Sequence, residues 1–428
     1  MTKLMNRLTP PEFKAVRDIA FPNIRIEKLD NGCPLYILNG GTQEVIKLDV
    51  MVNAGSIYST QKLVAPLTGL MLNEGTSGKN AHQIAEAFDF YGAYFQPTTE
   101  KDKTFVGLVT LSKYLEQTLP LFSEVLNQSI FPQKEFDILV DRRRQNFLVE
   151  QEKTSFLARE VFYEKLFGPN HPYGMKTQEA HYLTTPREDV FEFYQEHFHA
   201  GNFEFIVSGK VGKAEIQLIN QYLGRLPKKG TSESLTPTIQ TAKGMPPFVV
   251  EKESAVQSSI RTGLVTVNKL HPDYMGLKIL VTIFGGYFGS RLMKNIREEK
   301  GYTYGINAMQ VSLMQTGFMA VAADVKAENT REALHEIIVE MEKLKKEPIP
   351  VEELHLVRNY MMGDMLQMFD GPFSTADTFK AVVPYNLGFD YFRNMQETLW
   401  SISPKRLLEL ANRYFVTEKL TTVVAGKY

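Results

Sequence analysis

The 428-residue sequence has little of three features that would indicate particular classes of protein. It contains one cysteine, Cys33, which excludes an internal disulfide and a zinc cluster built from cysteines of this chain. Its 48 Lys and Arg residues balance 49 Asp and Glu residues, so no charge excess favours nucleic acid. It has no run of about 18 apolar residues, the length that crosses a bilayer, and no apolar signal-peptide core near Met1. We therefore expect no nucleic-acid or membrane partner and a cytoplasmic location.

The remaining composition is that of a globular protein, with 43% hydrophobic and 23% charged residues. The chain is too long for one ordinary core, so we expect two domains. Between Arg225 and Phe248 the sequence is rich in Pro, Gly, Ser, Thr and Lys and has no apolar periodicity, which is typical of a connection. We predict a first domain at residues 1–229, a linker at 230–247 and a second domain at 248–428.

The two halves of the chain repeat each other. The run FIVSGKV, which contains Gly209, matches TTVVAGKY, which contains Gly426, at a separation of 217 residues. The run FPQKEF from Phe131 matches IPVEEL from Ile349 at a separation of 218, and each opens a long helical segment. Two independent matches at nearly one spacing indicate a duplicated domain.

Each half begins with strands, continues with helices and closes with a strand. In residues 46–53, apolar residues alternate with Lys47 and Asp49, as in a strand that is buried on one face. Residues 317–325 have a similar role in the second half, and apolar spacings of three and four predict helices at 114–128, 186–198 and 330–346. The predicted fold class is α+β, with two tandem homologous domains, each a mostly antiparallel sheet with helices packed on one face.

Several short motifs occur in order along the chain. They are NAGS from Asn53, GT at Gly75, HPYG from His171, and FGGYFGSRLMKNIREEKGYTYG from Phe284 to Gly305. In this order and spacing they resemble the pitrilysin or insulinase family of zinc metallopeptidases, in the processing-peptidase-like subgroup. The resemblance covers nearly the whole chain.

The resemblance implies a zinc motif, H-x-x-E-H, on a helix just before the Gly-Thr turn. In active relatives the two histidines bind zinc from one helix face, and the glutamate between them activates the metal-bound water. Counted back from Gly75, these three positions are occupied here by Pro66, Gly69 and Leu70. None of these side chains binds a metal or accepts a proton.

The resemblance also implies a third ligand, a glutamate about 75 residues further on. That window falls at 145–147, and the nearest carboxylate, Glu150, lies outside the usual spacing. The neighbouring run Arg142 to Arg144 is most simply a solvated helix face. We predict that this chain holds no metal and no cofactor of its own.

The eight histidines do not rebuild the site, because no two are spaced i, i+4. We expect His197 and His199 to be surface residues near a helix C-terminus, His171 to belong to a structural turn, and His82 to cap a helix or face solvent. Cys33, which follows a turn-like Asn-Gly pair, is expected to be a packed or half-exposed thiol.

The segment that carries Arg297 and Tyr304 keeps the family's arginine and tyrosine, seven residues apart. In relatives these two residues contact the substrate backbone and the oxygen that gains charge in the transition state, a role that suits a guanidinium and a phenol. From the residues alone, an ion-pairing arginine and an ordinary strand tyrosine are the alternative. With the resemblance, Arg297 and Tyr304 are the predicted catalytic residues.

In heterodimeric bacterial members of the resembling family, one chain carries the zinc motif and the other carries the arginine and tyrosine. The resemblance therefore implies a subunit that is not active alone and needs a zinc-bearing homologous partner and a peptide substrate. The alternative is an inactive peptidase-like clamp that binds peptides or acts as a scaffold, as a homodimer.

Overall fold

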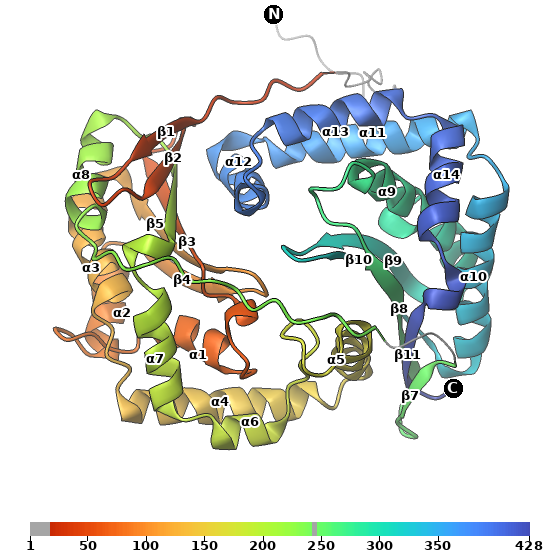
Figure 1. The fold of residues 1–428 in the computed structure, drawn as a ribbon, viewed down its shortest axis with the longest axis horizontal. Helices are drawn as coiled ribbons and strands as arrows, with labels where there is room; N and C mark the ends of the chain where they lie inside the picture. The colour runs from red at the N-terminus through yellow and green to blue at the C-terminus, as the bar shows by residue number, and fades with distance from the viewer. Residues whose placement is uncertain (1–17, 242–245) are drawn as a thin grey trace, which may run out of the picture.

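The computed structural model describes residues 18–241 and 246–428, and its two halves each contain a sheet (Figure 1). The first sheet has the strand order β1-β2-β6-β3-β5-β4 and the second has β7-β11-β8-β10-β9. The strands are β1 Arg25–Lys28, β2 Pro34–Asn39, β3 Val45–Val52, β4 Tyr94–Thr99, β5 Thr104–Leu111, β6 Phe203–Gly209, β7 Phe248–Glu251, β8 Gln257–Thr266, β9 Thr303–Ser312, β10 Gly317–Lys326 and β11 Thr421–Gly426.

Both sheets are mostly antiparallel, and each contains one parallel pair, β2 with β6 and β11 with β7. The closing strands β6 and β11 are the matched repeats, and both end at a glycine with positive φ, 113° at Gly209 and 127° at Gly426. A Cβ at Gly209 would lie 2.2 Å from the carbonyl oxygen of Val45. Only glycine fits this turn, which explains why the Gly-Lys endings are shared. The predicted α+β class is confirmed.

Fourteen α-helices pack around the sheets in the described residues. They are α1 Val64–Met71, α2 Ala81–Phe90, α3 Leu115–Asn127, α4 Gln133–Glu150, α5 Thr154–Phe167, α6 Glu179–Thr184, α7 Arg187–His197, α8 Lys213–Leu223, α9 Tyr274–Val281, α10 Thr330–Lys346, α11 Val351–Met368, α12 Gly371–Lys380, α13 Asp390–Ser401 and α14 Pro404–Tyr414. None of these helices is long and apolar enough to cross a membrane.

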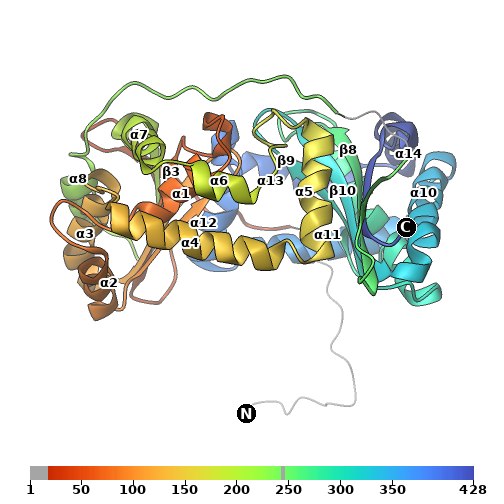
Figure 2. The ribbon, with the colours of Figure 1, turned by 90° about the horizontal axis from the view of Figure 1, so that it is seen from below.

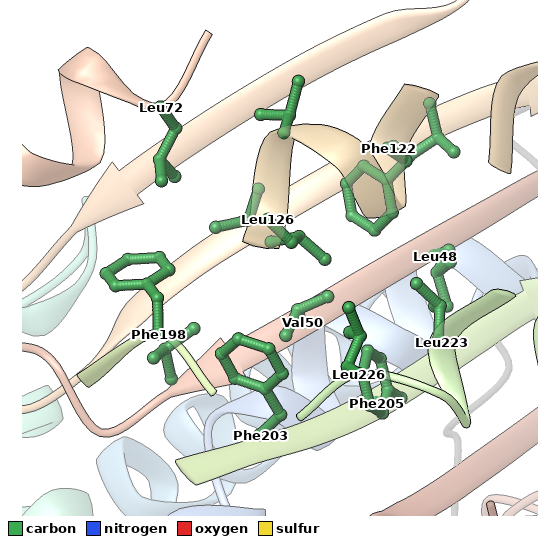
Figure 3. Packing of buried hydrophobic residues seen from close by; sticks show 14 of the residues in the cluster. Leu48, Val50, Leu72, Phe122, Leu126, Phe198, Phe203, Phe205, Leu223 and Leu226 are labelled. Carbon is green, nitrogen blue, oxygen red and sulfur yellow. The ribbon is translucent and has the colours of Figure 1, made fainter. Parts of the chain in front are cut away.

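The core of the first half lies between one face of its sheet and helices α1, α3, α7 and α8. Leu48 and Val50 of β3 are fully buried there, as the alternation predicted. Figure 3 shows Phe122 and Leu126 of α3 in the same cluster. The second half has a corresponding core between its sheet and helices α9, α10, α11 and α14 (Figure 1).

The opposite face of each sheet is covered by a helix from the other half of the sequence. Helix α5 packs on β8 and β11, where Phe162 joins a cluster with Phe318. Helix α12 packs on β2 and β6, where Phe379 meets Ile206. As a result Asp49, predicted on the open face of β3, is only 3% exposed, and Lys380 of α12 pairs with it at 3.0 Å. The sequence pattern does not reveal this crossing.

Two long helices lead into the crossing. Helices α4 and α11 each have 18 residues and begin after a proline, Pro132 and Pro350, with nearly identical backbone angles. They are the matched FPQKEF and IPVEEL segments. The duplicated helices α4 and α11 therefore lead directly to α5 and α12, each of which packs on the sheet of the other half.

The connection between the halves runs along the outside of the molecule (Figure 2). Residues 224–241 contain no helix or strand, and the connection is held by Leu235, whose N–H donates to the Ile57 carbonyl at 3.1 Å. Residues 242–245 of the predicted linker, and residues 1–17 of the predicted first domain, lie outside the described residues. The domain boundaries stay a prediction.

Candidate functional site

Helix α1 carries Pro66, Gly69 and Leu70, the positions that the resemblance aligns with the family's zinc ligands and base. The helix is buried, and its hydroxyl group at Thr68 is used within the fold, since it donates to the carbonyls of Val64 and Val190. The helix therefore serves as a packing element of the first half.

The space beside Gly69 is filled by a threonine of β4. A Cβ at Gly69 would lie 2.5 Å from Thr99 Oγ1, well inside van der Waals contact. Thr99 is held in place because its hydroxyl accepts a hydrogen bond from Thr104 Oγ1 at 3.0 Å. A glutamate at position 69 would have to displace this pair.

A cavity of about 300 Å³ lies between α1 and α4, and we call it the α1–α4 pocket. Its lining joins Pro66 and Leu70 to the window expected for the third ligand, where Phe147 lies between the rings of Phe156 and Tyr182 at 5.8 and 5.5 Å. The complete lining is Lys62, Leu63, Pro66, Leu67, Leu70, Arg143, Asn146, Phe147, Glu150, Phe156, Thr177 and Tyr182.

The pocket does not fit a zinc ion. Its lining has one carboxylate, Glu150, no histidine and no cysteine, whereas zinc requires three or four such ligands. Across residues 18–241 and 246–428 there is no group of three His, Cys, Asp or Glu side chains that could hold a metal.

The second predicted region has the opposite character. It consists of two π-helical segments, η4 Thr282–Gly286 and η5 Met293–Glu299, followed by a turn at Gly301, with φ of +66°, and then β9. Such π-helical turns occur frequently at functional sites. Arg297 lies at the end of η5 and Tyr304 is the second residue of β9, so the turn connects them directly.

Both predicted catalytic side chains face solvent. Tyr304 is 89% exposed on β9, which is an edge strand. Arg297 is half-buried, and its guanidinium lies 4.4 Å from the ring centroid of Phe288, a cation–π contact. Neither makes a hydrogen bond or ion pair with another residue of the part that the structure describes. Phe288, itself 62% exposed, was not singled out from sequence, because GGYFGS reads as a packing turn.

Tight packing supports this exposed segment from behind. A Cβ at Gly285 would lie 2.7 Å from the Ala308 side chain, so η4 sits directly against β9. Along β9, Ile306 and Ala308 are buried while Met309 is 41% exposed. The strand thus turns one face to the core and presents the other to solvent.

His171, His197, His199 and Cys33 are buried within the fold. His197 and His199 are each 3% exposed, so the prediction of surface positions was wrong. His197 is packed against the rings of Tyr58 and Phe193 at 5.3 and 4.1 Å.

The other predictions of this kind are confirmed. His171 belongs to a buried turn in which its Nδ1 accepts from the Tyr173 N–H at 3.0 Å. The side chain of His82 is 86% exposed on α2. Cys33 is buried, its thiol donates to the Ala200 carbonyl at 3.0 Å, and burial raises its pKa to about 11, so it is not a ready nucleophile.

The three arginines of α4 differ from one another, which corrects the prediction of one solvated face. Arg142 is exposed, Arg144 forms an ion pair with Glu179 at 2.6 Å, and Arg143 lines the α1–α4 pocket.

The two halves also meet through their hairpin tips. Asp102 lies between β4 and β5 and accepts a hydrogen bond from the Tyr173 hydroxyl. It also accepts one, at 3.0 Å, from the N–H of Met314, which lies in the β9–β10 turn. Beside it, Lys101 donates to the Tyr173 carbonyl at 2.8 Å, and burial lowers the pKa of Lys101 to about 7. This junction ties the first sheet to the second.

Comparison with known families agrees with this geometry. Residues 37–167 match the family model described as insulinase (peptidase family M16), and residues 185–361 match the one described as the peptidase M16 inactive domain. The chain belongs to the M16 peptidase family. The second match includes the connection between the halves. It also includes the part of the second half that carries Arg297 and Tyr304.

Individual relatives are distant. An uncharacterized zinc protease of Rickettsia felis is 24% identical over 80% of this chain and 83% of its own length. A probable mitochondrial-processing peptidase subunit beta of Schizosaccharomyces pombe is 21% identical over 67% of this chain and 64% of its own length. The crystal structure of a peptidase M16 inactive domain from Pseudomonas fluorescens has a TM-score of 0.84 and 23% identity, and the match covers 95% of this chain and 98% of that one. The likeness to the solved structure extends across the whole M16 fold.

Proposed function

We propose that this chain is the non-catalytic subunit of a heterodimeric zinc-dependent peptidase. Zinc, the attacking water and the base would come from a homologous partner chain. This chain would provide Arg297 and Tyr304 to the substrate. The observation that carries the proposal is that Tyr304, on β9, is 89% exposed, and that Arg297, on the adjoining η5, is half-buried. Neither makes a polar contact within the described residues.

The chemistry of the two groups suits an oxyanion. Peptide hydrolysis builds negative charge on the former carbonyl oxygen, and donors already aimed at that oxygen stabilise the transition state. A guanidinium and a phenol both donate hydrogen bonds, and the guanidinium presents several N–H donors in one plane. The contact with Phe288 holds the guanidinium without using any of its N–H donors.

The position of Tyr304 also suits an extended peptide. Strand β9 is the edge of the second sheet, and an edge strand presents unpaired backbone groups to which a further strand can add. A peptide bound in this way would run past Tyr304. The partner assignment is supported by the relative named as a processing-peptidase subunit.

The test is reconstitution with a relative from the same genome that carries H-x-x-E-H. The two chains are co-expressed, complex formation is followed by size-exclusion chromatography, and kcat is measured on a quenched fluorescent peptide library. We expect the Arg297→Ala and Tyr304→Phe complexes to form normally and to lose about 10²- to 10³-fold in kcat, the usual effect of removing an oxyanion donor.

Lys294→Ala is the matched control, since Lys294 is exposed on the same π-helical segment η5. It should leave kcat unchanged. Failure to form a complex with any such relative, or full activity of both site variants, would contradict the proposal. Tight peptide binding without turnover in every mixture would instead favour a peptide-binding clamp.

A further inference from the structure

The α1–α4 pocket combines apolar walls with positive charge at its rim. Its walls are made by seven apolar or aromatic side chains, Leu63, Pro66, Leu67, Leu70, Phe147, Phe156 and Tyr182. Pro66, Leu70 and Tyr182 are only half-buried, so the pocket is open to solvent. Its volume of about 300 Å³ is at the lower end of ligand sites, which suits a group the size of one or two residues.

Two of the polar lining residues are cations without an ion-pair partner. Neither Lys62 nor Arg143 forms a salt bridge with any residue in the described ranges 18–241 and 246–428. Burial lowers the pKa of Lys62, and nearby Glu160 offsets this in part. A bound anion would compensate both cations directly.

The carboxylates around the pocket are already engaged. Glu150 pairs with Lys153 at 2.5 Å, and Glu160 accepts the Thr177 N–H at 3.0 Å. A third cation, Arg159, lies over the ring of Phe156 at 5.2 Å. Glu160 also offsets part of the charge of Lys62, but the three cations Lys62, Arg143 and Arg159 outnumber this one carboxylate, so the site favours an anionic ligand.

The walls are ordered before any ligand binds. Phe147 is held between two aromatic rings, and Arg143 lies four residues before it on α4, on the same helix face. A ligand would thus find the apolar wall at Phe147 already ordered, which reduces the entropic cost of binding.

We propose that the α1–α4 pocket binds the C-terminal residue of a peptide. The apolar side chain of that residue occupies the cavity, and its α-carboxylate is held by Lys62 and Arg143. Pro66 and Leu70, which the resemblance aligns with the metal ligands of active relatives, thus form part of the apolar wall of this subsite. This inference does not depend on the proposed function, because it uses neither Arg297 nor Tyr304 and needs no partner chain.

The test is fluorescence anisotropy with the full chain alone. The probe is an N-terminally labelled hexapeptide that ends in leucine as the free acid, compared with the same peptide as the C-terminal amide and with one that ends in serine. We expect the free-acid leucine peptide to bind at least about tenfold more tightly than either of the others, because each lacks one of the two recognised groups.

Variants of the pocket sharpen the test. Lys62→Met and Arg143→Gln should each weaken binding of the free-acid peptide about tenfold and leave the affinity for the amide peptide unchanged. Leu70→Trp should fill the cavity and abolish binding of both peptides. Arg142→Gln is the matched control on α4, since Arg142 is exposed and outside the pocket. Circular dichroism confirms that each variant is folded.

Three outcomes would overturn the proposal. Equal affinity for acid and amide would show that the carboxylate is not read. Equal losses with Arg142→Gln and Arg143→Gln would indicate general charge attraction. Preferential binding of a short fatty acid over the leucine peptide would show that the site takes a lipid-like carboxylate instead.

Discussion

The two regions that the resemblance aligns with the family's catalytic machinery have opposite characters in this structure. On α1, the positions of the metal ligands are occupied by Pro66 and Leu70, and the place of the base is closed by Thr99. In the second half, Arg297 and Tyr304 remain at the surface without polar partners in the described structure. The difference teaches that the first region serves packing within the fold, whereas the second presents hydrogen-bond donors that the described fold does not use.

The largest expected effect on stability comes from introducing the H-x-x-E-H motif into α1. The triple variant Pro66→His, Gly69→Glu, Leu70→His should lose about 2–4 kcal/mol in unfolding free energy, because the new side chain at 69 overlaps Thr99 and two imidazoles replace apolar wall residues. Urea unfolding measures the loss. Gly363→Glu, at an open site on α11, is the control. A triple variant as stable as the wild type would show that α1 is not closed.

The stability that the junction at Asp102 and Lys101 gives to the two halves should depend on pH. The pKa of Lys101 is about 7 in the folded chain, against 10.5 for the exposed side chain, so between these values the unfolded state binds more protons. Stability should therefore rise from pH 7 to pH 9, by about 1–2 kcal/mol. Chemical unfolding at a series of pH values tests this.

Lys101→Met should reduce that rise, leaving the contributions of Lys269, whose pKa burial lowers to about 8, and of Lys62, Lys103 and Lys278, whose pKa burial also lowers. A stability that falls between pH 7 and pH 9 in the wild type would have the wrong sign for a buried lysine at this junction.

A smaller effect is expected at the exposed segment. Phe288→Leu removes the ring beneath Arg297, and we expect kcat of the reconstituted complex to fall about fivefold, which corresponds to about 1 kcal/mol, the size of a partly exposed cation–π contact. KM and complex formation should not change. Phe288→Trp keeps a π face and should restore kcat; a loss as large as that of the leucine variant would mean that Phe288 acts only by packing.

The smallest effect compares helical glycines of the two halves. Gly363→Ala on α11 meets no atom within 4 Å and should stabilise the chain by about 0.5–1 kcal/mol through helix propensity. Gly69→Ala on α1 should destabilise it, and Thr99→Ala should relieve that loss in the double variant. Thermal unfolding of the four variants shows whether each substitution raises or lowers stability. Similar shifts for the two glycines would remove the contrast between the helices.

Local patterns predicted the elements and their faces. The alternation in β3 identified Leu48 and Val50 as core, and the repeated segments identified the closing strands with Gly209 and Gly426. These features depend on neighbours in sequence, which is why one sequence was sufficient. The alignment of Pro66, Gly69 and Leu70 with the family's zinc motif, counted back from Gly75, stays a prediction.

Tertiary packing decided the features that the sequence did not reveal. Asp49 is buried because α12 crosses from the other half, and His197 is buried by aromatic rings of two separate elements. Arg143 differs from Arg142 only because of where α4 meets α1. Each depends on contacts between segments far apart in the chain, which periodicity does not encode.

Metal analysis of the chain purified without chelators, beside a zinc-bearing relative treated in the same way, tests the central claim most directly. The account predicts stoichiometric zinc in the relative and none in this chain, before and after incubation with excess zinc and dialysis. One zinc per chain that is lost in the Leu70→Trp variant would place a working metal site in the α1–α4 pocket and contradict the account.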